Sequence, residues 1–446
     1  MPFHLRLRRP GTRKAGAAAL TVGLALLLAA CGQNHPDSIF HQRTDFNRDV
    51  DLLFKILIYA GTAVFIFVEG ILVWTLIKYR HRPGRPDPEH VHGNTTLEIA
   101  WTIIPLFILI LIGIPTVKTI FKTQAKARGD ALQVEVIGHQ WWWEFRYPQY
   151  NVTTANELYL PLGRTVNFAL KTQDVIHSFW VPALAGKRDL VSNHTNYLWY
   201  TPDSATADAW NGACVEYCGT SHANMRFKTF TVAQADFDSW AAHQAEAAIG
   251  TSPTAPATGA AAAAPTTSAP PVAPATAAPA NAAAAPPGAV AQQPPAVTPP
   301  VAQAGFVSFA RDKMPPHTVP QTPLPANLAF DDNLLGKGDA GNGAKLMVSQ
   351  GGCLGCHGIK GNPMMVGVIG PNLTHIATRT TIAAGLFPND PRHLARWIKN
   401  APEMKPGVAM PTLGAGEYDP VRKMKSLVNL TDQQIADIVA YLQTLK

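Results

Sequence analysis

Two long apolar segments constrain the fold of this chain more than any other feature of its sequence. Residues 52–77 and 99–121 form runs of 26 and 23 residues that are dominated by apolar side chains. A helix of about 20 apolar residues is long enough to cross the hydrocarbon core of a membrane. Basic residues between the two runs favour a cytoplasmic loop. We therefore expect a two-helix transmembrane hairpin over residues 51–125, with its cytoplasmic loop at 78–97.

The N-terminus predicts export from the cytoplasm. Basic residues within residues 1–14 precede a short apolar stretch that ends Leu28-Ala29-Ala30-Cys31. This pattern is typical of a signal peptide, and its end resembles a bacterial lipoprotein processing site. We expect residues 1–30 to be the signal peptide and Cys31 to be lipidated; an uncleaved anchor with an incidental cysteine is the alternative. Export places the segment 31–50 outside, and two membrane crossings return everything after the hairpin to that side.

Residues 130–248 are predicted to form a β-domain. Short segments rich in β-branched and aromatic residues are separated there by turn-forming residues, which is typical of a β-sandwich or Greek-key barrel. The expected strands are residues 132–137, 159–160, 166–170, 197–200 and 227–232.

This domain contains a dense group of sulfur and nitrogen ligands. Cys214, Cys218, His222 and Met225 occur within twelve residues, and His177 adds a second imidazole. Thiolate, thioether and imidazole together favour copper. Two thiolates can bridge two coppers, each with one histidine, while Met225 and a backbone carbonyl complete the ligand shells. A Cys214–Cys218 disulfide and a tetrahedral zinc site are the alternatives.

Residues 249–327 differ from the rest of the chain because alanine, proline, threonine and glycine dominate them. Such a segment cannot bury enough apolar surface to order itself. We expect a disordered Pro/Ala-rich linker with a typical span of roughly 50 Å.

The C-terminal region, residues 328–446, carries the sequence Cys353-Leu-Gly-Cys356-His357. This spacing is typical of covalent haem c attachment, with Cys353 and Cys356 bonded to the porphyrin and His357 as the proximal iron ligand. A redox dithiol or half of a zinc site is the alternative, but no second cysteine pair lies nearby. Met410 is the expected distal ligand; the rivals are Met404, Met364, Met365, His375 and His393.

Four separated motifs closely resemble subunit II of cytochrome c oxidases over residues 40–245. They are Leu97–Pro105, Gly138–Trp143, Asp174–Trp180 and Cys214–Met225. The resemblance implies that the β-domain is cupredoxin-like and that its metal site is the dinuclear CuA centre. It also implies that Glu216 offers its carbonyl to copper and its carboxylate to a magnesium ion shared with subunit I.

The same resemblance assigns roles to two further residues. Trp141 would be the point where electrons enter, although an ordinary core or surface aromatic is the simpler interpretation. Glu98 would lie at the cytoplasmic mouth of a proton channel; alternatively it only caps its helix, three residues after Thr95. Quinol-oxidising relatives lack the copper ligands, so a quinol donor is disfavoured.

Residues 335–446 resemble class I cytochromes c, and the segment Gly370–Leu373 resembles the one whose proline carbonyl orients the proximal histidine. The expected helices are residues 341–349, 391–400 and 431–445. The expected fold is thus a transmembrane hairpin, a cupredoxin-like β-sandwich, a disordered linker and an all-α class I cytochrome c domain, the arrangement of caa-type oxidases.

These features predict subunit II of a haem–copper terminal oxidase in the bacterial inner membrane, with both domains on the periplasmic face. It would pass electrons from cytochrome c or another periplasmic donor, through its haem c and CuA, to subunit I, where oxygen is reduced with proton translocation. Subunits I and III and membrane lipid are the expected partners. The net charge of +7 does not indicate nucleic acid, because the basic residues lie at the N-terminus and beside apolar runs. A free-standing lipoprotein electron carrier and a subunit of a copper-dependent nitric oxide reductase are the rival functions.

Overall fold

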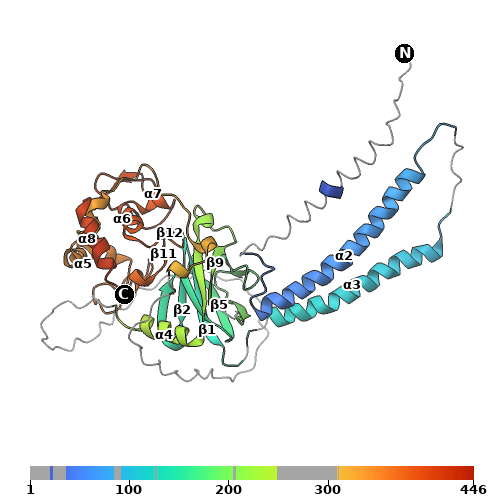
Figure 1. Ribbon diagram of the computed structural model, residues 1–446, viewed down its shortest axis with the longest axis horizontal. Helices are drawn as coiled ribbons and strands as arrows, with labels where there is room; N and C mark the ends of the chain where they lie inside the picture. Colours follow the sequence, from blue (N-terminus) through green and yellow to red (C-terminus); the bar gives the residue numbers. More distant parts are fainter. Residues whose placement is uncertain are drawn as a thin grey trace, which may run out of the picture.

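The computed structural model describes residues 21–23, 37–84, 92–124, 126–127, 129–203, 207–248, 309 and 311–446. Most of the expected signal peptide, the lipidation site Cys31 and most of the expected linker lie outside these residues. Figure 1 shows a long helical hairpin that projects from a β-domain, with a helical domain on the other side of the β-domain.

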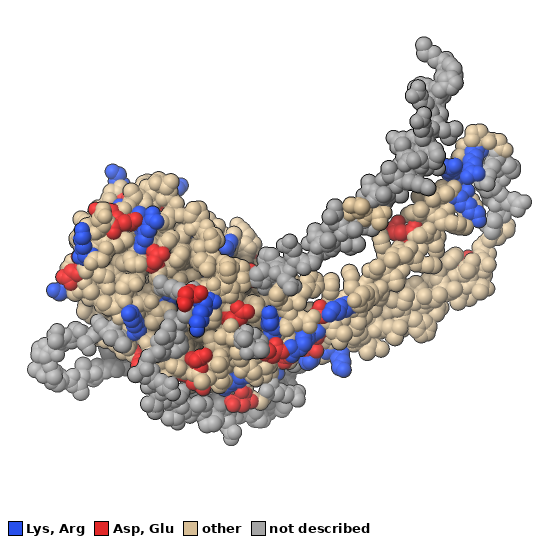
Figure 2. All heavy atoms as spheres, viewed as in Figure 1, with Lys and Arg blue, Asp and Glu red and all other residues tan. Residues whose placement is uncertain are grey.

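The hairpin consists of helices α2 (Asp45–Lys78) and α3 (Thr95–Gln124), which pack against each other. Both are long and apolar enough to cross a membrane, and large apolar side chains along them are exposed. Figure 2 shows charged atoms concentrated at the far end of the hairpin and where it joins the β-domain. Helix α3 differs from expectation at its start: the Asn94 side chain, rather than that of Thr95, accepts the capping hydrogen bond from the Leu97 amide at 3.2 Å.

The β-domain is a sandwich of two five-stranded sheets with strand orders β3-β2-β1-β5-β8 and β4-β10-β9-β6-β7. Each sheet combines parallel and antiparallel pairs. The strands are β1 (Leu132–His139), β2 (Trp142–Tyr147), β3 (Val152–Ala155), β4 (Glu157–Pro161), β5 (Val166–Thr172), β6 (His177–Trp180), β7 (Arg188–Leu190), β8 (Asn196–Tyr200), β9 (Asp208–Cys214) and β10 (Arg226–Val232), and helix α4 (Gln234–Ala245) follows them.

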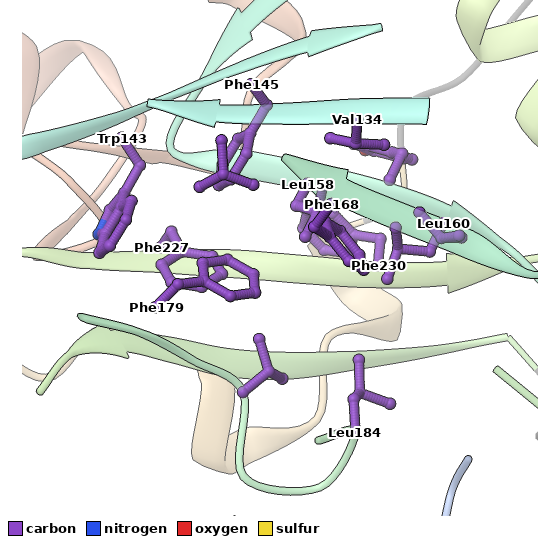
Figure 3. Packing of buried hydrophobic residues seen from close by; sticks show 14 of the residues in the cluster. Val134, Trp143, Phe145, Leu158, Leu160, Phe168, Phe179, Leu184, Phe227 and Phe230 are labelled. Atoms are coloured by element: carbon purple, nitrogen blue, oxygen red, sulfur yellow. The ribbon is translucent and has the colours of Figure 1, made fainter. Parts of the chain in front are cut away.

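Aromatic side chains fill the space between the two sheets. Trp143, Phe145, Phe179 and Phe227 are at most 1% exposed, and the rings of Phe179 and Phe227 stack with centroids 5.0 Å apart (Figure 3). Buried aromatic rings contribute large apolar areas to a core. Trp143 connects this core to the candidate metal ligands, because its ring centroid lies 6.2 Å from that of His177 and its indole nitrogen donates to the Met225 carbonyl at 3.4 Å.

The C-terminal domain packs four helices, α5 (Ala340–Val348), α6 (Pro391–Lys399), α7 (Ala401–Met404) and α8 (Asp432–Leu442). Helices α5 and α8 cross closely, since a side chain at Gly343 would collide with the Asp437 carbonyl. A capping box between Thr431 and Gln434 starts α8. Two short hairpins accompany the expected helices, β11 (Thr381–Ile382) with β12 (Phe387–Pro388) and β13 (Tyr418–Asp419) with β14 (Met424–Lys425).

The described part of the expected linker is ordered at its C-terminal end. The segment 311–327 contains 3₁₀ turns at Arg311–Lys313 and Pro316–Thr318. The Asn211 side chain of β9 donates to the His317 carbonyl at 2.9 Å, so this part of the chain lies along the β-domain before the C-terminal domain begins.

Candidate functional site

The expected copper ligands come together at one end of the sandwich. His177 begins β6 and Cys214 ends β9, while Cys218, His222 and Met225 lie on the loop that leads into β10. Pairing of β6 with β9 brings Phe179 opposite Cys214 and therefore places His177 beside the same loop. Residues that are far apart in sequence thus meet because the sheet joins their strands.

Their contacts form an ordered series. The Cys214 sulfur lies 3.8 Å from His177 Nδ1 and 3.7 Å from the Cys218 sulfur. The Cys218 sulfur lies 3.6 Å from His222 Nδ1 and 3.8 Å from the Met225 sulfur. The Cys214 sulfur also lies 3.3 Å from the Glu216 carbonyl oxygen. Each cysteine sulfur therefore lies beside one histidine, and the two sulfurs lie between the two imidazole rings.

The two sulfurs are too far apart for a disulfide, whose sulfur–sulfur bond is about 2.05 Å long. Both cysteines are free and buried. The contact with Cys218 lowers the pKa of the Cys214 thiol, and the same contact raises the pKa of Cys218. The two sulfurs therefore share one proton, and Cys214 is the one that favours the thiolate. Two thiolates, two imidazoles and a thioether fit copper better than zinc, which does not need the thioether.

Asp174 orients the first histidine. Its Oδ1 lies 2.8 Å from His177 Nε2, which leaves His177 Nδ1 facing Cys214. Burial lowers the pKa of His177, but the contacts with Asp174 and Cys214 outweigh burial, so the pKa is raised. Gly138 is required beside this ring, because a Cβ there would lie 2.7 Å from His177 Cδ2. Such outer contacts commonly fix the tautomer of a metal-binding histidine.

Trp141 lies directly against residues 215–225, the segment between β9 and β10 that we call the copper-binding loop. Its indole Nε1 donates to the Cys218 carbonyl at 2.9 Å, and Gln140 Nε2 donates to the same carbonyl at 2.8 Å. The indole is half-buried. The conjugated indole of Trp141 is therefore one hydrogen bond away from Cys218, whose sulfur is a candidate copper ligand.

A cavity of about 720 Å³ lies in the C-terminal domain and extends to its contact with the β-domain; Cys353, Cys356 and His357 line it. His357 Nδ1 lies 2.8 Å from the Pro371 carbonyl, as the resemblance implies, and this leaves Nε2 for an iron. Burial lowers the pKa of His357, which favours the neutral, ligating imidazole. A Cβ at Gly370 would lie 2.7 Å from His357 Cε1. The residues fit a covalently bound haem.

Among the expected distal ligands, the structure places only Met410 on the wall of this cavity. Met404 is buried in the hydrophobic core of the domain instead. The other rivals, Met364, Met365, His375 and His393, do not line the cavity, whereas Met347, which we did not consider, does.

The cavity extends to the β-domain, where Trp141 and Trp142 form part of its wall. Lys405, which is 2% exposed, crosses between the domains: its Nζ donates to the Trp141 carbonyl at 2.6 Å and to the Ala383 carbonyl at 3.3 Å. The two candidate centres are therefore on either side of Trp141.

Two expected site residues remain. Glu98 lies apart from this cluster, exposed in the first turn of α3. The Glu216 side chain is half-buried on the copper-binding loop. Sequence reasoning did not identify Asp174 or Lys405 as site residues. The spacing of Asp174 three residues before His177 could have indicated the first, whereas nothing in the sequence indicates the interdomain contacts of Lys405.

Comparison with known proteins agrees with this geometry. Family models match residues 42–119 (cytochrome c oxidase subunit II, transmembrane domain), 151–232 (cytochrome c oxidase subunit II, periplasmic domain) and 340–446 (cytochrome c). Cytochrome c oxidase subunit 2 of Alkalihalophilus pseudofirmus is 39% identical over 196 residues, which are 43% of this chain and 56% of the relative. The chain spans about half the length of this relative and of two similar Bacillus proteins.

A second relative is covered more fully. The probable cytochrome c oxidase subunit 2 of Rickettsia bellii is 33% identical over 207 residues, which are 42% of this chain and 76% of the relative. A solved periplasmic domain of subunit II of cytochrome oxidase from Bradyrhizobium japonicum is 26% identical and covers 27% of this chain and 96% of that domain, with a TM-score of 0.25. On the matched domains and the Rickettsia relative, the chain belongs to the cytochrome c oxidase subunit II family, and it carries a cytochrome c domain at its C-terminus.

Proposed function

We propose that this chain is the electron-accepting subunit of a haem–copper oxidase. It would receive electrons from cytochrome c or another periplasmic donor at its haem-binding domain and deliver them, at its copper-binding domain, to subunit I, where oxygen is reduced to water. The observation that carries the proposal is the position of Trp141, which touches the copper-binding loop on one side and lines the haem-sized cavity on the other.

His177, Cys214, Cys218, His222, Met225 and the Glu216 carbonyl would hold the dinuclear copper centre. Four of these side chains are at most 5% exposed, so the protein excludes water from the site and holds the ligands rigidly: His177, Cys214, Cys218 and Met225. Bound there, two coppers would supply a one-electron carrier. A ligand set that moves little on a change of charge suits fast electron transfer.

Cys353 and Cys356 would bind haem covalently, with His357 and Met410 as axial ligands. Haem c would supply a second one-electron carrier, and histidine–methionine ligation raises its potential. Pro371 fixes the orientation of the His357 ring by accepting its Nδ1 hydrogen bond.

Three finer assignments belong to the same proposal. Glu98, exposed where α3 begins, would lie at the mouth of a proton channel that serves proton translocation. The Glu216 carboxylate would bind magnesium at the contact with subunit I. Both exported domains would face the periplasm, with Cys31 as the lipid anchor, and subunits I and III would surround the hairpin.

Metal and haem content of the purified complex tests the proposal. We expect two coppers and one covalent haem from this chain, in addition to the copper and haem of subunit I, and oxygen consumption with reduced cytochrome c. Cys214→Ser should lose the two coppers of this chain and oxygen consumption while keeping the covalent haem and the copper of subunit I. Consumption of nitric oxide without consumption of oxygen, or an unchanged copper content in Cys214→Ser, would contradict the proposal.

A further inference from the structure

We propose that the haem-binding domain is docked on the copper-binding domain as a fixed internal partner that covers Trp141, and that Glu157 holds it there. This inference rests on the proposed function and deepens it. An external donor would then transfer electrons to the haem-binding domain alone and would not contact Trp141. Three separate contact sites between the domains support the inference.

Glu157 forms the first contact site. It lies on the edge strand β4 and is 3% exposed. Its Oε1 accepts hydrogen bonds from the Thr380 amide at 2.7 Å, the Thr380 hydroxyl at 2.6 Å and the Thr381 amide at 3.1 Å. Arg379, also buried, interacts electrostatically with the same carboxylate. A buried carboxylate is unfavourable unless it is hydrogen-bonded and paired, and here the other domain provides the hydrogen bonds.

The second contact site covers Trp141. Lys405 donates to the Trp141 carbonyl at 2.6 Å, and the Ser221 hydroxyl donates to the Pro406 carbonyl. Gly407, with φ of +83°, lies flat against the indole: a Cβ there would be 3.0 Å from the ring. Because only glycine fits this conformation and this approach, the segment leading to Met410 is shaped to lie on Trp141.

The third contact site lies at the C-terminal end of α4. His243 of α4 packs on His375 of the haem-binding domain with ring centroids 4.5 Å apart. Beyond α4, the Glu246 carbonyl lies 3.3 Å from His375 Nε2 of the haem-binding domain. These contacts involve neither Glu157 nor Trp141, so the interface extends well beyond one hydrogen-bonded group.

The charge balance of the two domains agrees with docking. Residues 131–250 contain 11 acidic and 7 basic side chains, whereas residues 331–446 contain 9 acidic and 12 basic ones. Opposite net charges favour association, and attachment in one chain raises the local concentration of each domain to the order of millimolar. A modest interaction free energy across the interface is therefore enough to keep the two domains docked.

Amide hydrogen exchange on the purified full-length complex tests the inference. In the native protein we expect slow exchange both at residues 380–381 and at residues 405–408. Glu157→Ala should raise exchange at 380–381 locally in any case, because the acceptor is lost. The decisive result is a rise of roughly tenfold or more at 405–408, which Glu157 does not touch. Hydroxyl-radical modification of Trp141 should increase in the same variant.

Glu135→Ala provides a matched control, because Glu135 is on the same domain and pairs with Lys171 of that domain at 2.7 Å. We expect native exchange at 405–408 in this variant. Should Glu157→Ala assemble poorly, Thr380→Val removes one donor from the opposite side and should shift exchange in the same direction. Unchanged exchange at 405–408 in Glu157→Ala, or fast exchange there in the native protein, would overturn the docking. Copper and haem measured on the same samples distinguish that outcome from failure of the proposed function.

Discussion

The contact between Asp174 and His177 gives a sharp test of the copper site. We expect Asp174→Asn to weaken copper binding while leaving the β-domain folded. Asp174 holds His177 Nε2 at 2.8 Å and also accepts from the Gln140 amide at 2.7 Å. Asp174 accepts these two bonds through different oxygens, whereas asparagine has one oxygen and no charge, so it can accept only one of them. Its NH₂ group, if turned toward Nε2, would move the imidazole proton to Nδ1, the atom that faces Cys214.

The size of the effect follows from this geometry. Loss of an outer hydrogen-bond partner typically lowers metal affinity 10- to 100-fold, which corresponds to about 1.4–2.8 kcal/mol. His177 is fully buried, so water cannot replace the lost carboxylate. We therefore expect a value in the upper half of that range.

Competition between the purified complex and a copper chelator of known affinity measures the change. Asp130→Asn is the control, since the Asp130 side chain is 93% exposed and lies 3.7 Å from Arg164. We expect the control to match the native affinity. Equal copper affinity in Asp174→Asn and native protein would refute the argument that Asp174 orients His177.

Four further substitutions test the haem-binding domain. Met410→His should retain covalent haem but lower its reduction potential in a redox titration, whereas Met404→Leu should leave the potential unchanged. Gly370→Ala should destabilise the domain by about 1–3 kcal/mol in thermal unfolding, because the added methyl group meets the His357 ring. Burial lowers the pKa of His375 to about 4, so its contribution to stability is present above its unfolded pKa of about 6.5 and is lost as the pH falls toward 4. We expect about 2 kcal/mol less stability at pH 5 than at pH 7 from this group, and His375→Gln should reduce that difference in melts at the two pH values.

Local patterns in the sequence predicted the long helices and five of the ten strands of the β-domain, but missed several short elements. The predicted helix at residues 341–349 and the strand at 166–170 agree closely with α5 and β5, because caps and alternating side chains mark them. Strand β2 was not predicted, although its sequence indicates a strand: Trp143, Phe145 and Tyr147 alternate with the charged residues Glu144 and Arg146.

The copper ligands could be grouped from sequence because four of them lie on one loop and their chemistry is distinctive. Met410 could be preferred over Met404 only by resemblance, since both are methionines in similar local sequence. The structure separates them by burial, which depends on how α7 packs into the core. The contact between Glu157 and Thr380 could not be predicted, because 223 residues separate the partners and neither has a sequence pattern that indicates the other.

Glu157 also has a role that is independent of electron transfer. Strand β4 is at the edge of its sheet, yet all five of its residues are buried. An uncovered apolar edge strand invites pairing with another chain, and natural proteins often oppose this with a charged residue on the edge. Before the C-terminal domain folds, an ionised Glu157 would keep this edge in solvent. Once the domain has docked, its Thr380 and Thr381 amides satisfy the same carboxylate. One acidic residue can thus protect the β-domain during assembly and fix the position of the haem-binding domain afterwards, and the exchange behaviour of Glu157→Ala should be accompanied by a greater tendency to aggregate.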